Sequence, residues 1–349
     1  MASITSLAFR KYLFDRLAEN MNGRTYICPS EMPVLHRFTK LEKYAVHDII
    51  NGKLTITSIS AFNDIYDGVM HEQLVNDSLR SKDEEDWHLT DSIHNAAGVS
   101  LSEESKQAFF NMRKHNAHLS FIGNFDFLRR LGIYLCCFSE KNDSILMWSH
   151  YAASNTGICV SYDFNTMKEE FRNMLLPVAY SNHPVTTPNF WGNTNLTDFE
   201  TEYNVYGTIL TKNKTWDYEK EWRLIFKIPQ ETRRRMSISI GLKPCAISFG
   251  YHFLKPFFFY VGDHVDIAET NNRFDNVIEL LEYMMDNNIK AYIMVPEIGE
   301  FNLKPVETNP QDLYDLITQI KKDKQHSLMT YSVVLQEMLD ILHEEQNYA

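Results

Sequence analysis

The sequence predicts an α+β fold with helical additions, and two observations carry this prediction. Short runs that alternate apolar and polar residues, or that are rich in β-branched residues, recur between residues 34 and 295. Longer helical patterns gather in separate blocks near the N-terminus, at residues 72–130 and after residue 301. Short strands mixed with segregated helical blocks are typical of α+β domains.

The first part of the chain begins with a helical pattern. Residues 4–20 are amphipathic, so residues 1–23 are expected to form an N-terminal helix that packs as an extra layer. A strand is expected at residues 34–38, and a helix at 41–50 ends favourably at Asn51-Gly52. A β-branched strand at residues 54–59 then leads into a polar turn at 62–68.

The middle of the chain changes character. Residues 72–130 are charged, with apolar residues at helical spacing, which predicts a helical insertion. Strands resume at residues 132–138 and 157–163, with a short helix at 147–152 between them. A strand at 177–180 precedes a long polar loop at 181–205, a kind of segment that often covers a site.

The last part of the chain predicts strands at residues 216–226, 246–249 and 290–295 and a helix at 274–285. Residues 24–300 are therefore expected to form the α+β core, interrupted by the insertion. Two helical patterns at 312–343 predict a C-terminal helical extension over residues 301–349.

Composition limits the classes of function. The chain has 349 residues and a formal net charge of -12, which argues against broad nucleic-acid binding, because that requires a concentrated basic surface. The dense basic run Arg233–Arg235 is interpreted as a turn, with a local nucleic-acid contact as the alternative. Five cysteines without metal-like spacing suit reduced thiols, and no run approaches the roughly 20 apolar residues of a membrane span. We expect a cytoplasmic protein without a membrane segment.

The segment 216–226, W-D-Y-E-K-E-W-R-L-I-F, is the most informative part of the chain. As a strand it would direct Glu219, Glu221 and Arg223 to one side and large apolar groups to the other. The two carboxylates would then lie ~6–7 Å apart. A functional site explains this pattern, and a solvated edge strand is the alternative.

Several common motifs are absent from the sequence. It contains neither G-x-x-x-x-G-K nor G-x-G-x-x-G, which argues against two routes to nucleotide binding, and it lacks G-x-S-x-G and H-E-x-x-H. His115 and His118 have helical spacing without acidic or thiol company, so a solvated face is expected and no metal is predicted. Cys136 fits a buried strand residue, with a nucleophile as the alternative.

Four segments carry a resemblance to a known family. They are L-H-R-F at 35–38, F-N-D at 62–64 with Asp67, C-F-S at 137–139 running into M-W-S-H-Y-A at 147–152, and W-D-Y-E-K-E-W-R at 216–223. In this order they resemble the bacterial family known as domain of unknown function 2971, over about residues 33–255. Ile65 stands where that family usually has proline, which would loosen the turn. The resemblance implies a fold and no activity.

A more distant resemblance implies an activity. Residues 35–52 and the late E-x-E are similar to ADP-ribosyltransferase-like domains, which implies a split β-sheet core and NAD as a co-substrate. On this resemblance Glu221 accepts from the ribose 2′-hydroxyl and stabilises the oxocarbenium-like charge, while Glu219 orients the acceptor. Tyr151 stacks on nicotinamide, with Tyr66 as its rival. The implied catalytic residues are Glu221, Glu219 and Tyr151, and the implied NAD-binding residues are His36, Arg37, Tyr66, Ser149 and Arg223.

Structural roles are the alternative for these residues. His36 could satisfy a buried backbone group, and Tyr151 could belong to the core. Asp64 and Asp67 are good turn formers, which competes with metal binding. Arg223 could exist to neutralise one of the glutamates.

Three hypotheses follow. The leading one is an NAD-consuming transferase or glycohydrolase, in the setting of a bacterial defence or toxin effector, with a protein or small-molecule acceptor. The second is a hydrolase that uses Glu219 and Glu221 as acid and base. The third is a non-catalytic sensor or interaction module whose helices contact a protein partner. The sequence leaves the oligomeric state open.

The arrangement in space separates these hypotheses. A cleft that joins His36, Tyr151 and Glu221 would favour the first. Convergence of Asp64 and Asp67 on the glutamates would favour a metal hydrolase, and scattered positions beside an exposed apolar patch would favour the module.

Overall fold

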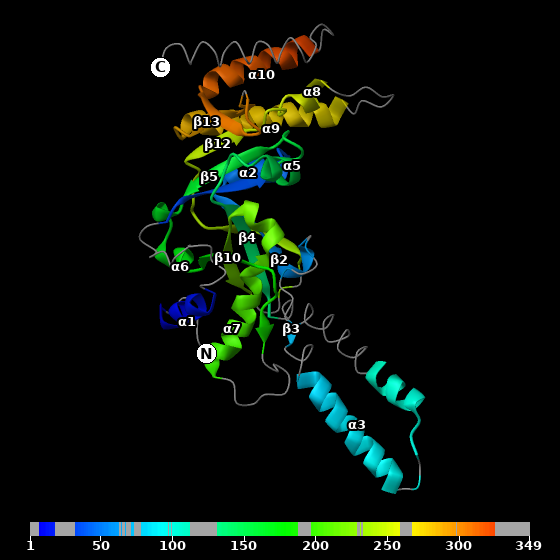
Figure 1. The fold of residues 1–349 in the computed structure, drawn as a ribbon. Helices are drawn as coiled ribbons and strands as arrows, with labels where there is room; N and C mark the ends of the chain where they lie inside the picture. The colour runs from blue at the N-terminus through cyan, green and yellow to red at the C-terminus, as the bar shows by residue number, and fades with distance from the viewer. Residues whose placement is uncertain are drawn as a thin grey trace.

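A computed structural model describes most of the chain and shows a mixed α and β architecture (Figure 1). The described residues are 7–17, 32–62, 64, 67, 71–72, 78–96, 98, 100–111, 131–187, 197–228, 231, 233–258, 267–297 and 299–324. Among them, no helix is both long and apolar enough to cross a membrane. The predicted α+β class is therefore confirmed at the level of mixed helix and sheet.

One large sheet organises the described residues, in the order β11-β2-β4-β1-β5-β12-β13-β14; in addition, β10 pairs with β4, and β6 pairs with β10. Its pairs are antiparallel except for β12 with β13. The strands are β1 Val34–Thr39, β2 Lys53–Ser58, β4 Ile133–Ser139, β5 Ile158–Asp163, β6 Leu175–Pro177, β10 Glu221–Lys227, β11 Arg235–Ser239, β12 Ala246–Phe249, β13 Lys290–Pro296 and β14 Leu303–Thr308. Two small sheets pair β3 His71–Glu72 with β8 Thr186–Thr187, and β7 Ala179–Ser181 with β9 Thr211–Asn213.

The large sheet is split beside β4. One edge of β4 pairs with β10 along its whole length, while the other edge is shared by two strands. β2 pairs at Tyr134 and Leu135, and β1 pairs at Ser139. Between these points the registers of β1 and β2 place no partner opposite residues 136–138. β1 and β2 thus diverge from β4 and leave a gap within the sheet.

Helices cover the sheet on both sides of this split. α2 Lys43–Ile50, α8 Lys255–Phe258, α9 Ile267–Asp286 and α10 Pro310–Lys324 belong to a first apolar core with β1, β5, β12 and β13. α1 Leu7–Leu17 and α7 Asp198–Ile209 enclose a second core against β4, β6 and β10. α5 Ile145–Tyr151 packs on β1 through Trp148 and Phe38. The shorter helices are η2 Ile59–Ala61, η4 Phe164–Thr166, α6 Glu169–Arg172 and η5 Lys214–Glu219.

The side chains of β10 alternate between two buried environments. Trp222, Leu224 and Phe226 belong to the first core, and Ile225 belongs to the second. Glu221 and Arg223 lie on the same side as Ile225 and are buried too. The predicted alternation is confirmed, but the alternative of a solvated edge strand is wrong, because helices and a second core cover the charged side.

Several predicted elements differ from the structure. Residues 214–219 form η5, Lys220 has a positive φ of 44°, and β10 begins only at Glu221. The expected loop at 181–205 contains the start of α7, whose N-terminus carries a capping box formed by Thr197 and Glu200. β14 lies after residue 300 and pairs with β13, so the sheet continues beyond the expected core.

The helical insertion is partly described. α3 Ser78–Ala96 and a helix at residues 103–111 extend away from the sheet (Figure 1). The predicted elements at 34–38, 41–50, 54–59, 147–152, 157–163, 246–249, 274–285 and 290–295 correspond to β1, α2, β2, α5, β5, β12, α9 and β13. His115 and His118, and the second helix expected in the tail, lie outside the described residues.

Candidate functional site

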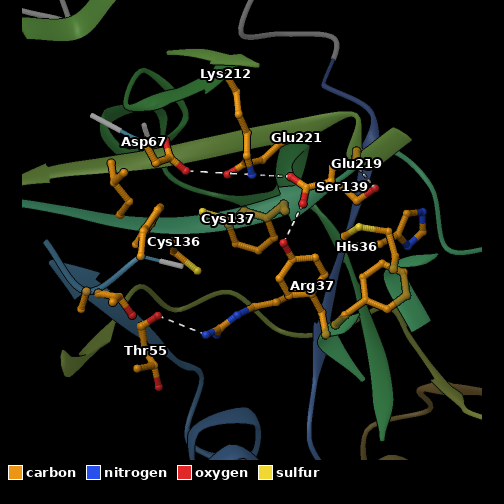
Figure 2. Close-up of a pocket in the computed structure, with 18 of the residues that line it drawn as sticks. His36, Arg37, Thr55, Asp67, Cys136, Cys137, Ser139, Lys212, Glu219 and Glu221 are labelled. Atoms are coloured by element: carbon orange, nitrogen blue, oxygen red, sulfur yellow. Dashed lines mark hydrogen bonds and ion pairs between the residues drawn. The ribbon is translucent and has the colours of Figure 1, made fainter. Parts of the chain in front are cut away.

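A cavity of about 310 Å³ occupies the split in the sheet (Figure 2). Residues 36–38 of β1, Thr55 and Thr57 of β2, and residues 135–139 of β4 line it. Further lining comes from α5, β9, η5 and the start of β10. Because strands that are distant in sequence diverge here, the cavity opens within the sheet rather than on its surface.

Two carboxylates share one ammonium group at one end of this cavity. Lys212 Nζ lies 2.6 Å from Glu219 Oε2 and 3.3 Å from Glu221 Oε2. The Tyr151 hydroxyl donates to Glu219 Oε1 at 2.6 Å. All three charged side chains are almost fully buried and line the cavity. Glu219 reaches the site from η5 and Glu221 from β10, so the left-handed residue Lys220 turns both toward Lys212.

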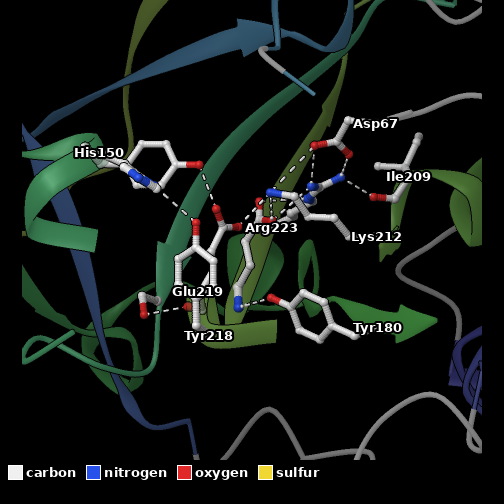
Figure 3. A network of polar contacts seen from close by, with 11 residues as sticks. Asp67, His150, Tyr180, Ile209, Lys212, Tyr218, Glu219 and Arg223 are labelled. Atoms are coloured by element: carbon white, nitrogen blue, oxygen red, sulfur yellow. Dashed lines mark hydrogen bonds and ion pairs between the residues drawn. The ribbon is translucent and has the colours of Figure 1, made fainter. Parts of the chain in front are cut away.

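Arg223 lies behind this pair and is fully buried. Its guanidinium forms two hydrogen bonds with Asp67, of 2.6 and 2.9 Å, and two with Glu221, of 2.9 and 3.0 Å (Figure 3). It does not line the cavity. The structure therefore assigns Arg223 the neutralising role, and it is not placed to bind a ligand in this cavity.

With all five groups ionised, the buried cluster carries one excess negative charge, because Asp67, Glu219 and Glu221 contribute three negative charges and Lys212 and Arg223 two positive ones. Burial raises the pKa of Glu219, and the neighbouring Glu221 raises it further. Burial also opposes ionisation of Glu221, but Arg223 and Lys212 outweigh it and hold its pKa below the usual range. Glu221 is thus the fixed anion, and Glu219 accepts a proton more readily.

His36 and Arg37 enter the cavity from β1. His36 Nδ1 shares a hydrogen bond of 2.9 Å with Ser161 Oγ, and burial lowers the pKa of His36 to about 4, so it is neutral near pH 7. Arg37 Nη2 donates to the carbonyl oxygen of Thr55 at 3.1 Å, which is its one hydrogen bond to a described residue. In Figure 2 Arg37 reaches toward Thr55, away from the carboxylates.

The cavity brings together five of the eight candidate residues of the sequence. These are His36, Arg37, Tyr151, Glu219 and Glu221. Ser149 is exposed on α5 and does not line the cavity, so its predicted NAD contact is not supported. Tyr66 lies outside the described residues.

Other residues of the site have roles that the sequence pattern does not indicate. No local sequence pattern around Lys212 indicates that it belongs to the site, because its position beside the glutamates depends on the pairing of β9 with β7. Asp67, interpreted from the sequence as a turn former, also clamps Arg223. Cys136 lines the cavity, but burial raises the pKa of its thiol, which favours the interpretation as a buried strand residue.

Comparisons with known proteins give one result. A family model described as "Protein of unknown function (DUF2971)" matches residues 147–224. This span contains most of α5 together with Lys212, Glu219 and Glu221, and it supports the resemblance based on M-W-S-H-Y-A and W-D-Y-E-K-E-W-R. No curated protein and no solved structure matches the chain significantly.

Proposed function

We propose that the protein cleaves the bond between nicotinamide and ribose in NAD and transfers ADP-ribose to water or to an acceptor. The observation that carries this proposal is a single cavity that joins His36, Tyr151 and Glu221. The split of the sheet between β1 and β2 also supports it, because the ADP-ribosyltransferase-like resemblance implies a split sheet.

The charges around the cavity suit a ligand that is cationic at one end and anionic at the other. The carboxylate cluster has one excess negative charge and would favour the positively charged nicotinamide ring. Arg37 and Arg235 line the cavity as well. Among the described residues Arg37 donates one hydrogen bond, to Thr55, and its other N–H groups are suited to the pyrophosphate. The cavity would enclose the nicotinamide riboside part, with the phosphates toward the two arginines.

Glu221 would act on the sugar. Two contacts with Arg223 and one with Lys212 hold this carboxylate in one position and keep it ionised. As the C1′–N1 bond of NAD breaks, its electron pair passes to the nicotinamide nitrogen, and positive charge develops on the ribose ring. A preorganised anion stabilises that charge without having to rearrange.

Glu219 would act as the general base that accepts the proton of the nucleophile. Its pKa is raised, and it lies beside both Lys212 and Tyr151. The nucleophile, water or an acceptor group, forms a new bond to C1′, and its proton moves to Glu219 and then to solvent. A carboxylate with a raised pKa is suited to this transfer near neutral pH. Neutral His36 remains available to a ribose hydroxyl.

A metal-dependent hydrolase fits this geometry less well. Asp67 does converge with both glutamates, but the Lys212 ammonium and the Arg223 guanidinium occupy the space among the three carboxylates. Asp64 does not line the cavity. A cation would have to displace two buried positive charges.

The test is release of nicotinamide from NAD by the purified full chain, with and without cell extract. Glu221→Gln is expected to lower the rate about 100-fold or more, because it removes the fixed charge. Glu219→Gln should lower it about 100-fold, mainly by removing proton transfer.

Two further variants keep the test interpretable. Tyr151→Phe retains the ring and the packing and removes the contact to Glu219, so a reduced rate in a folded variant supports the site. Glu279→Gln is the matched control, because Glu279 is exposed on α9 and lines neither this cavity nor its neighbours. No nicotinamide release by the wild type in either condition, or equal release by all four variants, would contradict the proposal.

A further inference from the structure

A second cavity of about 380 Å³ lies between the start of α2, the turn that follows α5 and the helices α8 and α9. It shares no lining residue with the cavity in the split sheet. Three cationic side chains and one anionic one line it, Lys40, Lys43, Arg273 and Glu42, which leaves a surplus of two positive charges. In a chain with a formal net charge of -12, such a local surplus favours an anionic ligand.

The start of α2 adds backbone donors to this cavity. The N-cap residue Glu42 makes no side-chain capping hydrogen bond. The N–H of Val46 is the first to bond back, to the Glu42 carbonyl, and the N–H of Lys43 has no acceptor among the described residues. Uncapped N–H groups at a helix start bind phosphate and other anions well.

Asn276 of α9 points independently to a ligand. This side chain is 8% exposed and lines the cavity, yet no described group forms a hydrogen bond with its amide. The amide is not among the fully enclosed side-chain atoms that lack a partner, and it lines the cavity, where a ligand can reach it. Polar groups with so little exposure usually have a partner. A bound ligand with a polar group would supply the missing partner.

The turn that follows α5 forms one wall of the cavity and is conformationally strained. Ala153, Ser154 and Asn155 have consecutive positive φ values of 49°, 57° and 66°, and Ala153 lines the cavity. The turn is held by tight packing, since a Cβ on Gly250 would lie 2.3 Å from the Asn155 carbonyl oxygen. Strain of this kind concentrates at ligand sites.

We propose that this second cavity binds a small molecule that carries a phosphate group beside an aromatic or apolar part, such as a nucleoside monophosphate. Phe253 and Phe257 supply an apolar wall for the ring, and Lys40, Lys43 and the α2 start face the phosphate. This site goes beyond the proposed NAD chemistry and does not depend on it.

The test is direct calorimetric titration of the full chain with adenosine monophosphate, adenosine and inorganic phosphate. The double variant Lys40→Gln/Lys43→Gln is expected to weaken binding of the monophosphate about tenfold or more. Adenosine and phosphate alone should each bind more weakly than the monophosphate. Lys227→Gln, an exposed lysine at the end of β10, is the matched control and should change nothing.

Two further variants show whether the monophosphate binds in this cavity or in the first one. Asn276→Leu should weaken binding while the melting temperature stays equal or rises, because the amide lacks a protein partner; a merely structural Asn276 would give a lower melting temperature. Arg37→Gln removes a cationic group of the first cavity and should leave this binding intact. No heat of binding at millimolar monophosphate, or equal affinity in Lys40→Gln/Lys43→Gln, would overturn the proposal.

Discussion

The carboxylate cluster in the split sheet and the cavity beside α2 treat their polar groups in opposite ways. In the cluster each carboxylate contacts a cation: Glu219 contacts Lys212, and Arg223 contacts both Asp67 and Glu221. Beside α2, the amide of Asn276 and the first N–H of α2 have no hydrogen-bond partner among the described residues. The difference teaches that complete pairing holds a site in shape before a ligand arrives, whereas missing partners mark where a ligand would complete the structure.

The largest expected effect tests the pairing in the cluster. Arg223→Met leaves Asp67 and Glu221 buried without their guanidinium, so the free energy of unfolding should fall by about 3–5 kcal/mol. Denaturant unfolding would measure it. Arg235→Met, at an exposed position of β11, is the control and should stay within about 0.5 kcal/mol. Equal effects of the two substitutions would mean that the cluster does not stabilise the fold.

The next effect concerns His36, which lies in the same cavity outside the cluster. Its pKa is lowered from 6.5 to about 4 by burial, so the unfolded chain binds more protons between these pH values. The stability contributed by neutral His36 is present above pH 6.5 and is lost as the pH falls toward about 4. Over this window the free energy of unfolding should fall by about 2–3 kcal/mol more in the wild type than in His36→Gln. Parallel pH profiles of the two proteins would refute the prediction.

A smaller effect tests the hydrogen bond at the edge of the cluster. Tyr151→Phe removes a 2.6 Å bond to Glu219 and keeps the ring, so the free energy of unfolding should fall by about 1–2 kcal/mol. Tyr314→Phe is the matched control, because its hydroxyl makes an exposed contact of 3.4 Å with Glu282. An equal loss in the free energy of unfolding of both variants would contradict the prediction that the buried bond to Glu219 stabilises the fold.

The smallest effect tests the strained wall of the second cavity. Ala153→Gly places glycine at a φ of 49°, which relieves the left-handed strain and should stabilise the fold by about 0.5 kcal/mol after the entropy of glycine is subtracted. Ala152→Gly is the neighbouring control, since Ala152 has a φ of -107° and is fully buried, and it should lower stability. Thermal unfolding should therefore give a higher melting temperature for Ala153→Gly and a lower one for Ala152→Gly, and a lower melting temperature for Ala153→Gly would contradict the prediction.

Much of the fold could be predicted from local pattern. Alternation and β-branched residues located β1, β2, β5 and β13, and helical spacing located α2 and α9, because each of these elements presents an apolar side to one core. The pattern misplaced residues 216–220, where η5 and the left-handed Lys220 precede the strand. Dihedral choices at a single residue leave little trace in periodicity. The capping box at Thr197 was a readable signal of α7 that the polar composition of the loop obscured.

The candidate site, like the fold, could be predicted only in part from the sequence. The sequence by itself determined which residue types stand at 36, 37, 151, 219 and 221, and motif order indicated that they belong together. Only the tertiary structure decided that Lys212 from β9 lies between the glutamates and that Asp67 clamps Arg223. These contacts join segments up to 156 positions apart, and pairing over such separations depends on how the strands assemble rather than on any local period. The tertiary structure also set the two glutamates apart. Burial and the neighbouring Glu221 raise the pKa of Glu219, whereas Arg223 and Lys212 outweigh burial and hold the pKa of Glu221 below its usual range.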